Sequence, residues 1–566
     1  MMRTPRCPVP RVARAPIAAF VAAGLLVSAI SMAGSDHDAS IRADDLREWL
    51  TYLASDELQG RATYEAGLGL AAGYIQGHLR TWGVRPGSEH GSYIQTVRVH
   101  GVRATSRSTV TVKVGEETRT FRDGQGVTFP PNAGGKRTLT IDRILFVGYG
   151  LDAQAVGHMD VGDRDVRGSA VVWLGLEGPQ SVDAGRYRRV LAGRGRYATE
   201  QRGALASIGP EAPPATPAEP PARPAPGDAP AAISFTTAQR LDHLVPPSIR
   251  GSEGFYRFLL SRAAHGYDDL KRRAEAREPL PSFPLDGVSL TFVVDHDYEI
   301  VRTQLTQNVV GVVDGRDPQL GATYVAFGAH FDHVGYVQGV VGADGRRADP
   351  PGRVTEGAVE DAVWNGADDN GSGTVAVLAV AKAFATGPRP KRSLLFVWHG
   401  GEERGLLGSR YFVDHPTVPL GSVVAHFNAD MIGRNRDDRP TEANRVYLVG
   451  SDRISSELHE ISREANRSLP EPLILDYEMN DPADLEQVYF RSDHYSYAAR
   501  GIPVIFFTTG LHPDYHANTD HVAKIEFEKL TRIARLLYET GARVADLDHQ
   551  PMRDHLGPRA GKGTPW

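Results

Sequence analysis

Imidazole and carboxylate side chains follow four apolar runs in the carboxyl-terminal half of this sequence. ATYVAFGA precedes His330, SLLFVWHGG precedes Glu402 and Glu403, and VVAHFNA precedes Asp430. A fourth run, IPVIFFTTG, is followed after a short loop by His516. Open α/β sheets bind ligands beyond the carboxyl ends of their strands. If these runs are strands of such a sheet, we expect the five side chains to meet at one edge.

A glycine-rich segment, GADDNGSG, adds Asp368 and Asp369 in front of a predicted helix. Each signal alone has an ordinary structural explanation, such as a helix cap for an aspartate or a tight turn for the glycines. The combination of signals is not explained in this way, because converging carboxylates repel one another in a dry cleft unless a cation compensates them. Nitrogen and oxygen ligands without sulfur favour zinc, with manganese or cobalt as alternatives. The pattern therefore predicts a metal site.

The elements that would carry these side chains alternate along the chain. The apolar runs, which include NVVGVVD from Asn308, are nearly continuous, as is typical of strands buried on both faces. Helical periodicity is found between the runs and near the amino terminus, at residues 44–53, 68–82, 374–384, 455–467 and 527–545. Strands that alternate with helices predict an α/β fold with a mostly parallel central sheet flanked by helices.

The length of 566 residues indicates two domains, or one domain with a large insertion. Short β-like runs broken by glycine lie between residues 93 and 172 and predict a β-rich region. Proline and alanine dominate residues 209–232, a composition that predicts an extended tether with nothing to pack.

The amino terminus has the pattern of a secretory signal. Four arginines precede an apolar run at residues 17–30, which ends in small residues at Ala33. A membrane anchor is the alternative, but the run is short for a full span. We expect cleavage after Ala33 and a secreted or periplasmic protein. The only cysteine, Cys7, would be lost with the signal, which excludes thiolate catalysis and disulfides from the mature chain.

The charge balance argues against nucleic acid as a partner. Lys and Arg number 63 against 69 Asp and Glu, for a net charge of -6, and no run of basic residues stands out. The hydrophobic share of 41% and charged share of 23% are those of a soluble globular protein. This balance does not select a substrate class. We expect no stable membrane association once the signal is removed.

Five motifs resemble, in order, those of the co-catalytic two-zinc exopeptidases. They are AHFDHVG, NGADDNGSG, WHGGEERGLLGSRYF, FNADMIGRN and RSDHYSYAARGIPVIFFTTGLHPDYHANTD. This family includes secreted bacterial aminopeptidases and glutamate carboxypeptidase, with the transferrin receptor as a non-catalytic relative. The resemblance implies a peptide or protein substrate and the zinc exopeptidase fold over residues 41–97 and 300–545. The polar, glycine-rich end of the sequence predicts a flexible tail at 546–566. FVGYGLDA and DVRGSAVVWL resemble the protease-associated domain of some members, which implies an insert over residues 98–299.

The family resemblance also implies the metal ligands. His330, Asp369 and Asp430 would hold one zinc ion, and Asp369, Glu403 and His516 would hold the other. Asp369 would bridge the two ions, because a carboxylate offers two oxygens whereas an imidazole does not. It is chosen over its neighbour because it directly precedes the asparagine of the family motif.

Three further residues receive catalytic roles from the resemblance. Glu402, free of the metals, would act as general base on a metal-bridged water and return the proton to the leaving amine. Asp332 would fix the orientation of the His330 imidazole. Tyr515 would stabilise the oxyanion with its hydroxyl, although a packing role is equally consistent with its position.

The resemblance leaves several functions open. An aminopeptidase needs acidic groups for a free amine, and Asp368 is one candidate. A carboxypeptidase needs a cation, for which Arg434 and Arg491 are candidates. A binding protein that kept only the fold would not need the intact ligand set, and a glutaminyl cyclase would work with one zinc ion. We expect an aminopeptidase. Other polar residues near the motifs are predicted to be structural: His333, His399, His426, His494, His512, His521, Asp493 and Asp520.

Overall fold

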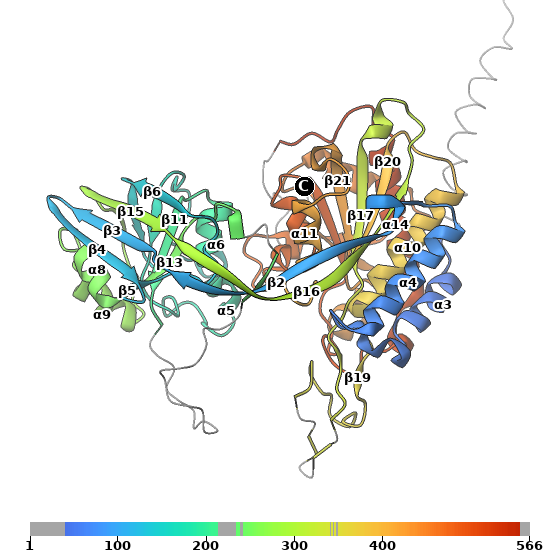
Figure 1. Ribbon diagram of the computed structural model, residues 1–566, viewed down its shortest axis with the longest axis horizontal. Helices are drawn as coiled ribbons and strands as arrows, with labels where there is room; N and C mark the ends of the chain where they lie inside the picture. The colour runs from blue at the N-terminus through green and yellow to red at the C-terminus, as the bar shows by residue number, and fades with distance from the viewer. Residues whose placement is uncertain are drawn as a thin grey trace, which may run out of the picture.

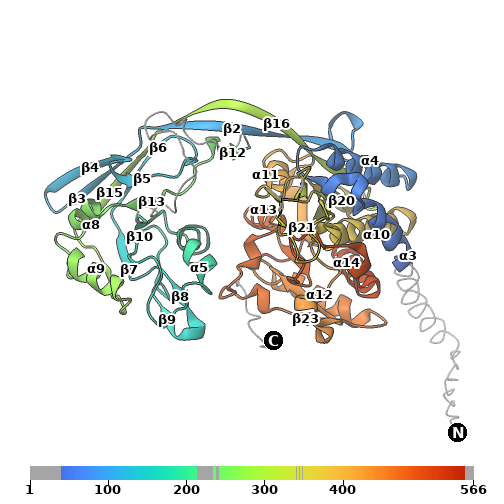
Figure 2. The ribbon, with the colours of Figure 1, turned by 90° about the horizontal axis from the view of Figure 1, so that it is seen from below.

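The computed structural model describes residues 40–212, 234–237, 241–339, 341–342, 345–346 and 349–554. The predicted signal peptide (1–33) and most of the predicted tether lie outside these ranges. Figure 1 shows two bodies joined by a long antiparallel ribbon of β2 (Ile94–Ser106) and β16 (His296–Val313). Figure 2 shows that this ribbon runs along one side of both bodies. Among the described residues, no helix combines the length and apolar character needed to cross a membrane.

The larger body, here called the α/β body, is built around a ten-stranded mixed sheet. Its strand order is β12 (Ser234–Thr236), β2, β16, β20 (Ser393–His399), β17 (Tyr324–His330), β21 (Val423–Ala429), β24 (Val504–Thr508), β22 (Arg445–Val449) and β23 (Ile474–Asp476), with β1 (Arg85–Pro86) on β16. The four central strands are β20, β17, β21 and β24, and they are parallel to one another. The strands on either side of them, β16 and β22, are antiparallel to their neighbours. The predicted α/β class is confirmed, and the parallel part is the part that ends in the predicted site residues.

Helices cover both faces of this sheet. On one face lie α3 (Ala43–Leu53), α4 (Ala66–Thr81), α10 (Gly373–Thr386), α12 (Ser456–Ser468) and α14 (Phe527–Ala545), and on the other α11 (Leu407–Asp414) and α13 (His494–Ala498). Successive strand residues alternate between the two cores: Phe327 packs with the first set and Ala326 with the second. This double burial explains the nearly continuous apolar runs. The five predicted helices agree with the observed bounds within two residues at each end.

The second body, here called the β-rich body, comprises the described residues between 109 and 294 other than β12, and it has a ten-stranded sheet and a hydrophobic core of its own. Its strand order is β14 (Ser282–Pro284), β7 (Ile144–Val147), β10 (Ala170–Val172), β11 (Ala206–Pro210), β13 (Ser248–Gly251), β5 (Gly126–Thr128), β4 (Glu117–Asp123), β3 (Thr109–Val114), β15 (Val288–Val294) and β6 (Arg137–Ile141). Its helices are α5 (Arg188–Ala192), α6 (Arg194–Arg196), α8 (Glu253–Leu259) and α9 (Tyr267–Glu275).

The domain junctions predicted from the sequence lie in the ribbon that joins the two bodies. The positions 97/98 and 299/300 both fall inside the ribbon, which pairs without a gap from Ile94 and Val309 to Ser106 and His296, apart from one bulge beside Ile300. At the other end of the chain, residues 546–554 run along the α/β body. There Arg392 Nη2 donates to the carbonyl of His549 at 2.7 Å.

Candidate metal centre

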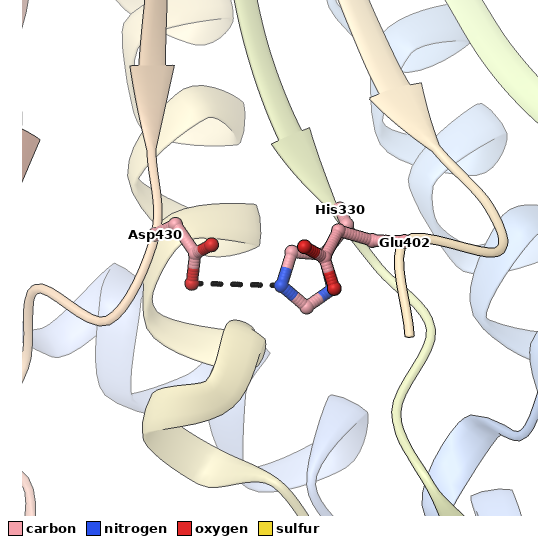
Figure 3. A group of neighbouring side chains, drawn as sticks. All are labelled: His330, Glu402 and Asp430. Carbon is pink, nitrogen blue, oxygen red and sulfur yellow. Dashed lines mark ion pairs between the residues drawn. The ribbon is translucent and has the colours of Figure 1, made fainter. Parts of the chain in front are cut away.

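The first cluster of the predicted site residues forms where three parallel strands end. His330 is the last residue of β17, Asp430 directly follows β21, and Glu402 lies just beyond β20. Figure 3 shows the three side chains facing a common space, with His330 Nε2 3.5 Å from Asp430 Oδ1. Ligand atoms of all three lie within 4.8 Å of one another, as a metal site requires. The parallel register, which pairs His330 with His399 at the end of β20, brings these ends level.

Asp369 connects this cluster with a second one. Its Oδ1 lies 3.4 Å from His330 Nε2, and its Oδ2 lies 3.1 Å from His516 Nε2. The residue sits in the turn Ala367–Ser372 that leads into α10, and its peptide bond to Asn370 is cis. Asn370 fixes this turn, because its side-chain amide donates to the Ala429 carbonyl at 2.9 Å. The turn therefore presents one carboxylate to two imidazoles from different segments.

The second cluster contains Glu403 and two histidines. Glu403 Oε2 lies 3.0 Å from His516 Nε2, and its Oε1 lies 2.9 Å from His333 Nδ1. Ligand atoms of His333, Asp369 and Glu403 also lie within 4.8 Å of one another. His333 is predicted from the sequence to be structural and outside the ligand set, and it lies buried against both carboxylates. Its position only three residues after His330, in the loop at the same strand end, is the signal that could have identified it.

The distances in both clusters fit a metal centre. Tetrahedral zinc with bonds of about 2.0–2.1 Å holds its ligand atoms about 3.3 Å apart. The contacts that His330 and His516 make with the carboxylates span 3.0 to 3.5 Å. Two of the buried atoms, Asp369 Oδ2 and His333 Nε2, have no hydrogen-bond partner among the described residues, so the short approach of Asp369 to His516 lacks hydrogen-bond geometry. Atoms that aim at a shared point rather than at each other are arranged as ligands.

The pKa values show how strongly the carboxylates require positive charge. Burial lowers the pKa of His516, but the adjacent carboxylates of Asp369 and Glu403 favour the charged ring and raise the value to about 11. Burial raises the pKa of Glu403, yet the carboxylate stays ionised with a pKa of about 2 because His333 and His516 are its neighbours. Metal ions or imidazole protons must therefore occupy this centre, and the two compete for the same nitrogens.

Glu402 differs from its neighbour. Burial, together with the charges of Glu403 and Asp430, raises the pKa of Glu402 well above its ordinary value, although His330 opposes the shift. The side chains of Glu402 and Glu403 belong to different clusters, as expected for adjacent residues beyond a strand. A carboxyl with a raised pKa is a stronger base than a solvated one.

Asp332 supports the centre in a different way from the one predicted. His330 Nδ1 donates to the main-chain carbonyl of Asp332 at 3.1 Å, whereas the carboxylate Oδ1 is 3.7 Å away, beyond hydrogen-bond distance. The carboxylate accepts instead from Thr63 Oγ1 at 2.8 Å and from the backbone N–H of Glu402 at 3.1 Å. Asp332 therefore orients His330 through its backbone and fixes the backbone of Glu402 through its side chain.

Tyr515 lies beside the centre, and two residues that the sequence analysis did not select, Ser492 and Asn428, lie behind Asp430. The Tyr515 ring lies 4.1 Å from the His516 ring, and its hydroxyl accepts a hydrogen bond from Arg491 Nη2 at 3.3 Å. Ser492 Oγ donates to Asp430 Oδ2 at 2.6 Å and accepts from the Asn428 side chain at 2.8 Å. Both oxygens of Asp430 are thus assigned, one to Ser492 and one to the centre.

Two residues that were considered for substrate binding are committed elsewhere. Asp368 is fully buried and accepts from the N–H of Gly433 at 2.6 Å, so it does not offer its carboxylate to a substrate amine. Arg434 pairs with Asp438 at 2.6 Å and Asp514 at 3.1 Å and does not line the cavity described below.

The remaining polar residues of the motifs lie outside the two clusters. His399 and His494 are buried, and burial lowers the pKa of each to about 3. The His426 ring stacks on Tyr497 at 3.8 Å. His512 faces Asp368, His521 faces Asp361, Asp520 accepts the N–H groups of Asp368 and Asp369, and Asp493 is fully buried with a pKa raised to about 7 by burial.

A cavity of about 290 Å³ opens onto the centre. Its lining includes residues of the two clusters and five apolar residues: Met431, Met479, Val488, Phe506 and Leu511. The polar part of the lining outside the centre has four carboxylates, Asp437, Glu478, Asp484 and Glu486, against two guanidinium groups, Arg436 and Arg491.

The segment that carries the centre matches a known protein family. Residues 308–541 match the model of Peptidase family M28. The M28 segment contains all five predicted ligands together with Glu402, Asp332 and Tyr515. The resemblance to the zinc exopeptidases, which rested on the motifs alone, is thereby confirmed.

Curated relatives match the chain over part of their length. Leupeptin-inactivating enzyme 1 of Streptomyces exfoliatus is 38% identical over 120 residues, which are 19% of this chain and 27% of the relative. Aminopeptidase YwaD of Bacillus subtilis is 31% identical over 179 residues, 30% of this chain and 36% of the relative. A probable leucine aminopeptidase of Arthroderma benhamiae is 30% identical over 182 residues, 30% of this chain and 46% of the relative. The matches thus span about a quarter to a half of these relatives.

Solved structures can be superposed over more of the chain. An aminopeptidase from Aneurinibacillus sp. strain AM-1 has a TM-score of 0.43 and 18% identity, covering 92% of this chain and 98% of its own. A zinc aminopeptidase from Bacillus subtilis has a TM-score of 0.41 and 17% identity, covering 91% of this chain and 97% of its own.

Proposed function

We propose that this chain is a metallo-aminopeptidase that hydrolyses the first peptide bond of a peptide with a free amino terminus. Two zinc ions would occupy the centre, one held by His330, Asp369 and Asp430, the other by Asp369, Glu403 and His516. The observation that carries the proposal is the carboxylate of Asp369, whose two oxygens face different histidines at 3.4 and 3.1 Å. One carboxylate shared in this way is the arrangement that a bridged pair of ions needs. The family match of residues 308–541 supports the assignment.

The residues around the ions have separate tasks. When bound, zinc supplies Lewis acidity to the scissile carbonyl and lowers the pKa of water. Glu402 accepts the proton of the attacking water and delivers it to the leaving nitrogen, which its raised pKa favours. The Tyr515 hydroxyl, which accepts from Arg491 and keeps its own proton, donates to the oxygen that becomes negative. His333 orients Glu403 through the 2.9 Å contact with Oε1.

The cavity favours the amino end of a substrate over the carboxyl end. Beyond the centre its lining has an excess of carboxylates, which attract an α-ammonium group. A carboxypeptidase would need an unpaired cation, but Arg436 faces Glu478 at 3.4 Å and Arg491 faces Glu486 at 3.1 Å. The apolar part of the lining, which includes Met479 and Phe506, suits an apolar first side chain.

The decisive experiment is a panel of peptides that differ only at their ends. Zinc-loaded protein is incubated with an apolar tetrapeptide that is free, amino-terminally acetylated, or carboxyl-terminally amidated. We expect the free and amidated peptides to lose their first residue, the acetylated peptide to survive, and a chelator to stop cleavage until zinc is restored. Cleavage of the acetylated peptide with protection by amidation would show a carboxypeptidase instead.

The predicted export also remains part of the proposal. We propose that residues 1–33 direct secretion and are removed, and that residues 98–299 form a protease-associated-like insert in a peptidase domain of residues 41–97 and 300–545. Amino-terminal sequencing of the protein recovered outside the cytoplasm should begin at Gly34. An intact Met1 in that fraction would contradict the signal assignment.

A further inference from the structure

The β-rich body contacts the wall of the cavity. Figure 2 shows α5 on the side of the β-rich body that faces the α/β body. Arg189 in α5 places its Nε 2.9 Å from Glu486 Oε2, and the Arg196 guanidinium lies over the Phe490 ring at 4.2 Å. Glu200, just beyond α6, accepts a hydrogen bond from the Tyr495 hydroxyl. These partners belong to a short stretch, residues 486–495, that also supplies Glu486, Val488 and Arg491 to the cavity lining.

One oxygen of Glu486 contacts an arginine of the β-rich body and an arginine that lines the cavity. Oε2 lies 2.9 Å from Arg189 Nε and 3.1 Å from Arg491 Nη1, so it is shared by a cation from each body. The second terminal nitrogen of Arg491, Nη2, donates a hydrogen bond to the Tyr515 hydroxyl at 3.3 Å. Four side chains thus form a chain of contacts from the surface of the β-rich body to the residue beside His516.

The two outer side chains of this chain of contacts are more exposed than Arg491. The side chains of Arg189 and Glu486 are 43% and 51% exposed, whereas that of Arg491 is 21% exposed. A planar guanidinium that is held at both ends in a partly dry site keeps one orientation. Because Arg491 donates to the hydroxyl oxygen of Tyr515, the hydroxyl proton is directed away from Arg491.

We propose that Arg491 is a positioning residue that aims the Tyr515 hydroxyl at the reacting carbonyl, and that Arg189 of the β-rich body holds Arg491 in place through Glu486. This inference rests on the proposed peptidase function and assigns the β-rich body a part in it. Arg491 acts through Tyr515, so its removal lowers turnover rather than substrate binding.

The test is a double-mutant cycle on the zinc-loaded full-length protein. Variants Tyr515→Phe, Arg491→Met and the pair are assayed for kcat and KM on the free apolar tetrapeptide, with zinc content measured for each. We expect about a 100-fold loss of kcat for Tyr515→Phe and about a tenfold loss for Arg491→Met, with KM and zinc unchanged. In the Tyr515→Phe background, Arg491→Met should cost less than about twofold, because its effect passes through the hydroxyl.

The link to the β-rich body is tested in the same assay. Arg189→Met should lower kcat by about two- to threefold, a small effect because half-exposed ion pairs are weak. It should have no effect once Arg491 is already Met. Arg188→Met is the matched control, an exposed arginine on the same helix whose removal should leave kcat unchanged.

Three outcomes would overturn the inference. An equal loss from Arg491→Met in both backgrounds would show that Arg491 acts independently of Tyr515. A rise in KM with unchanged kcat would show that it binds substrate instead. An effect of Arg188→Met as large as that of Arg189→Met would remove the role of Glu486. Failure of the proposed function is distinguishable, because the unmodified zinc-loaded protein would then not cleave the peptide.

Discussion

Buried charged side chains have different partners in the two bodies. In the β-rich body, Asp160 accepts backbone N–H groups of Tyr149 and Leu151 at 2.9 and 3.1 Å, and Arg194 donates to backbone carbonyls, including that of Tyr149 at 2.7 Å. In the α/β body, Asp369 and the histidines around it face one another. Buried charge that satisfies the backbone holds a loop in place. Asp160 also faces His158 Nε2 at 2.9 Å, but it is a single carboxylate. The carboxylates of Asp369, Glu403 and Asp430 converge and therefore require cations, and this convergence distinguishes a site from a scaffold.

The largest expected effect is the loss of metal and activity when Asp369, the carboxylate shared by the two clusters, is replaced. Asp369→Asn removes one charge from a carboxylate that faces both clusters, so both ions should be lost together and peptide hydrolysis should fall by more than about 10⁴-fold. Elemental analysis and the tetrapeptide assay provide the measurements. The control is Asp160→Asn in the β-rich body, which should keep zinc content and activity per folded molecule. Normal zinc in Asp369→Asn would contradict the shared carboxylate.

Glu402→Gln separates chemistry from metal binding. The variant should keep both ions and the fold but lose about 10²–10⁴-fold in kcat, since the amide cannot accept the proton of water. Its neighbour gives the contrast, because Glu403→Gln should lose metal as well as turnover. If Glu402→Gln instead releases zinc, the carboxylate is a ligand of the first cluster, close to His330 and Asp430.

Two buried arginines sharpen the comparison further. Arg61 donates to the carbonyls of Phe331 and Gly366, which flank the loops of the centre, whereas Arg194 donates to carbonyls of the β-rich body. Replacement of either arginine by Met leaves buried carbonyl groups without a hydrogen-bond donor. It should therefore lower the free energy of unfolding by about 2–4 kcal/mol. Only Arg61→Met should also weaken zinc binding, by about tenfold. Chemical denaturation and zinc titration measure the two effects, and equal zinc affinity in both variants would argue against a coupling between Arg61 and the centre.

The smallest effect is a dependence on pH. In the metal-free chain the pKa of His516 is raised to about 11, so its stabilising contribution is complete below about pH 6.5 and declines as the pH rises toward 11. Zinc requires the neutral ring, so the increase in Tm on adding zinc should grow between pH 6 and pH 9. Thermal melts with zinc and with chelator measure this increase. An increment that stays constant or shrinks over this interval would contradict the competition between protons and metal.

The sequence predicted the α/β class and the edge of the sheet at which its polar residues meet. The reason is local: strands such as β17 are buried on both faces, so their apolar runs are unambiguous, and parallel neighbours bring their ends together. The position of His333, three residues after His330, places it at the same strand end, but its contact with Glu403 depends on the path of the loop. The contact between Arg189 and Glu486 was also beyond reach, since it joins residues of two bodies whose relative placement no local pattern encodes.

The comparison between the bodies depends on one quantity, the number of zinc ions that the folded chain holds at the ends of β17, β20 and β21. The direct measurement is a crystal of the zinc-loaded protein examined for anomalous scattering at the zinc edge. Our account predicts two peaks, one on each side of the Asp369 carboxylate, each within about 2.0–2.2 Å of its ligand atoms. A single peak, or none between His330 and His516, would contradict it.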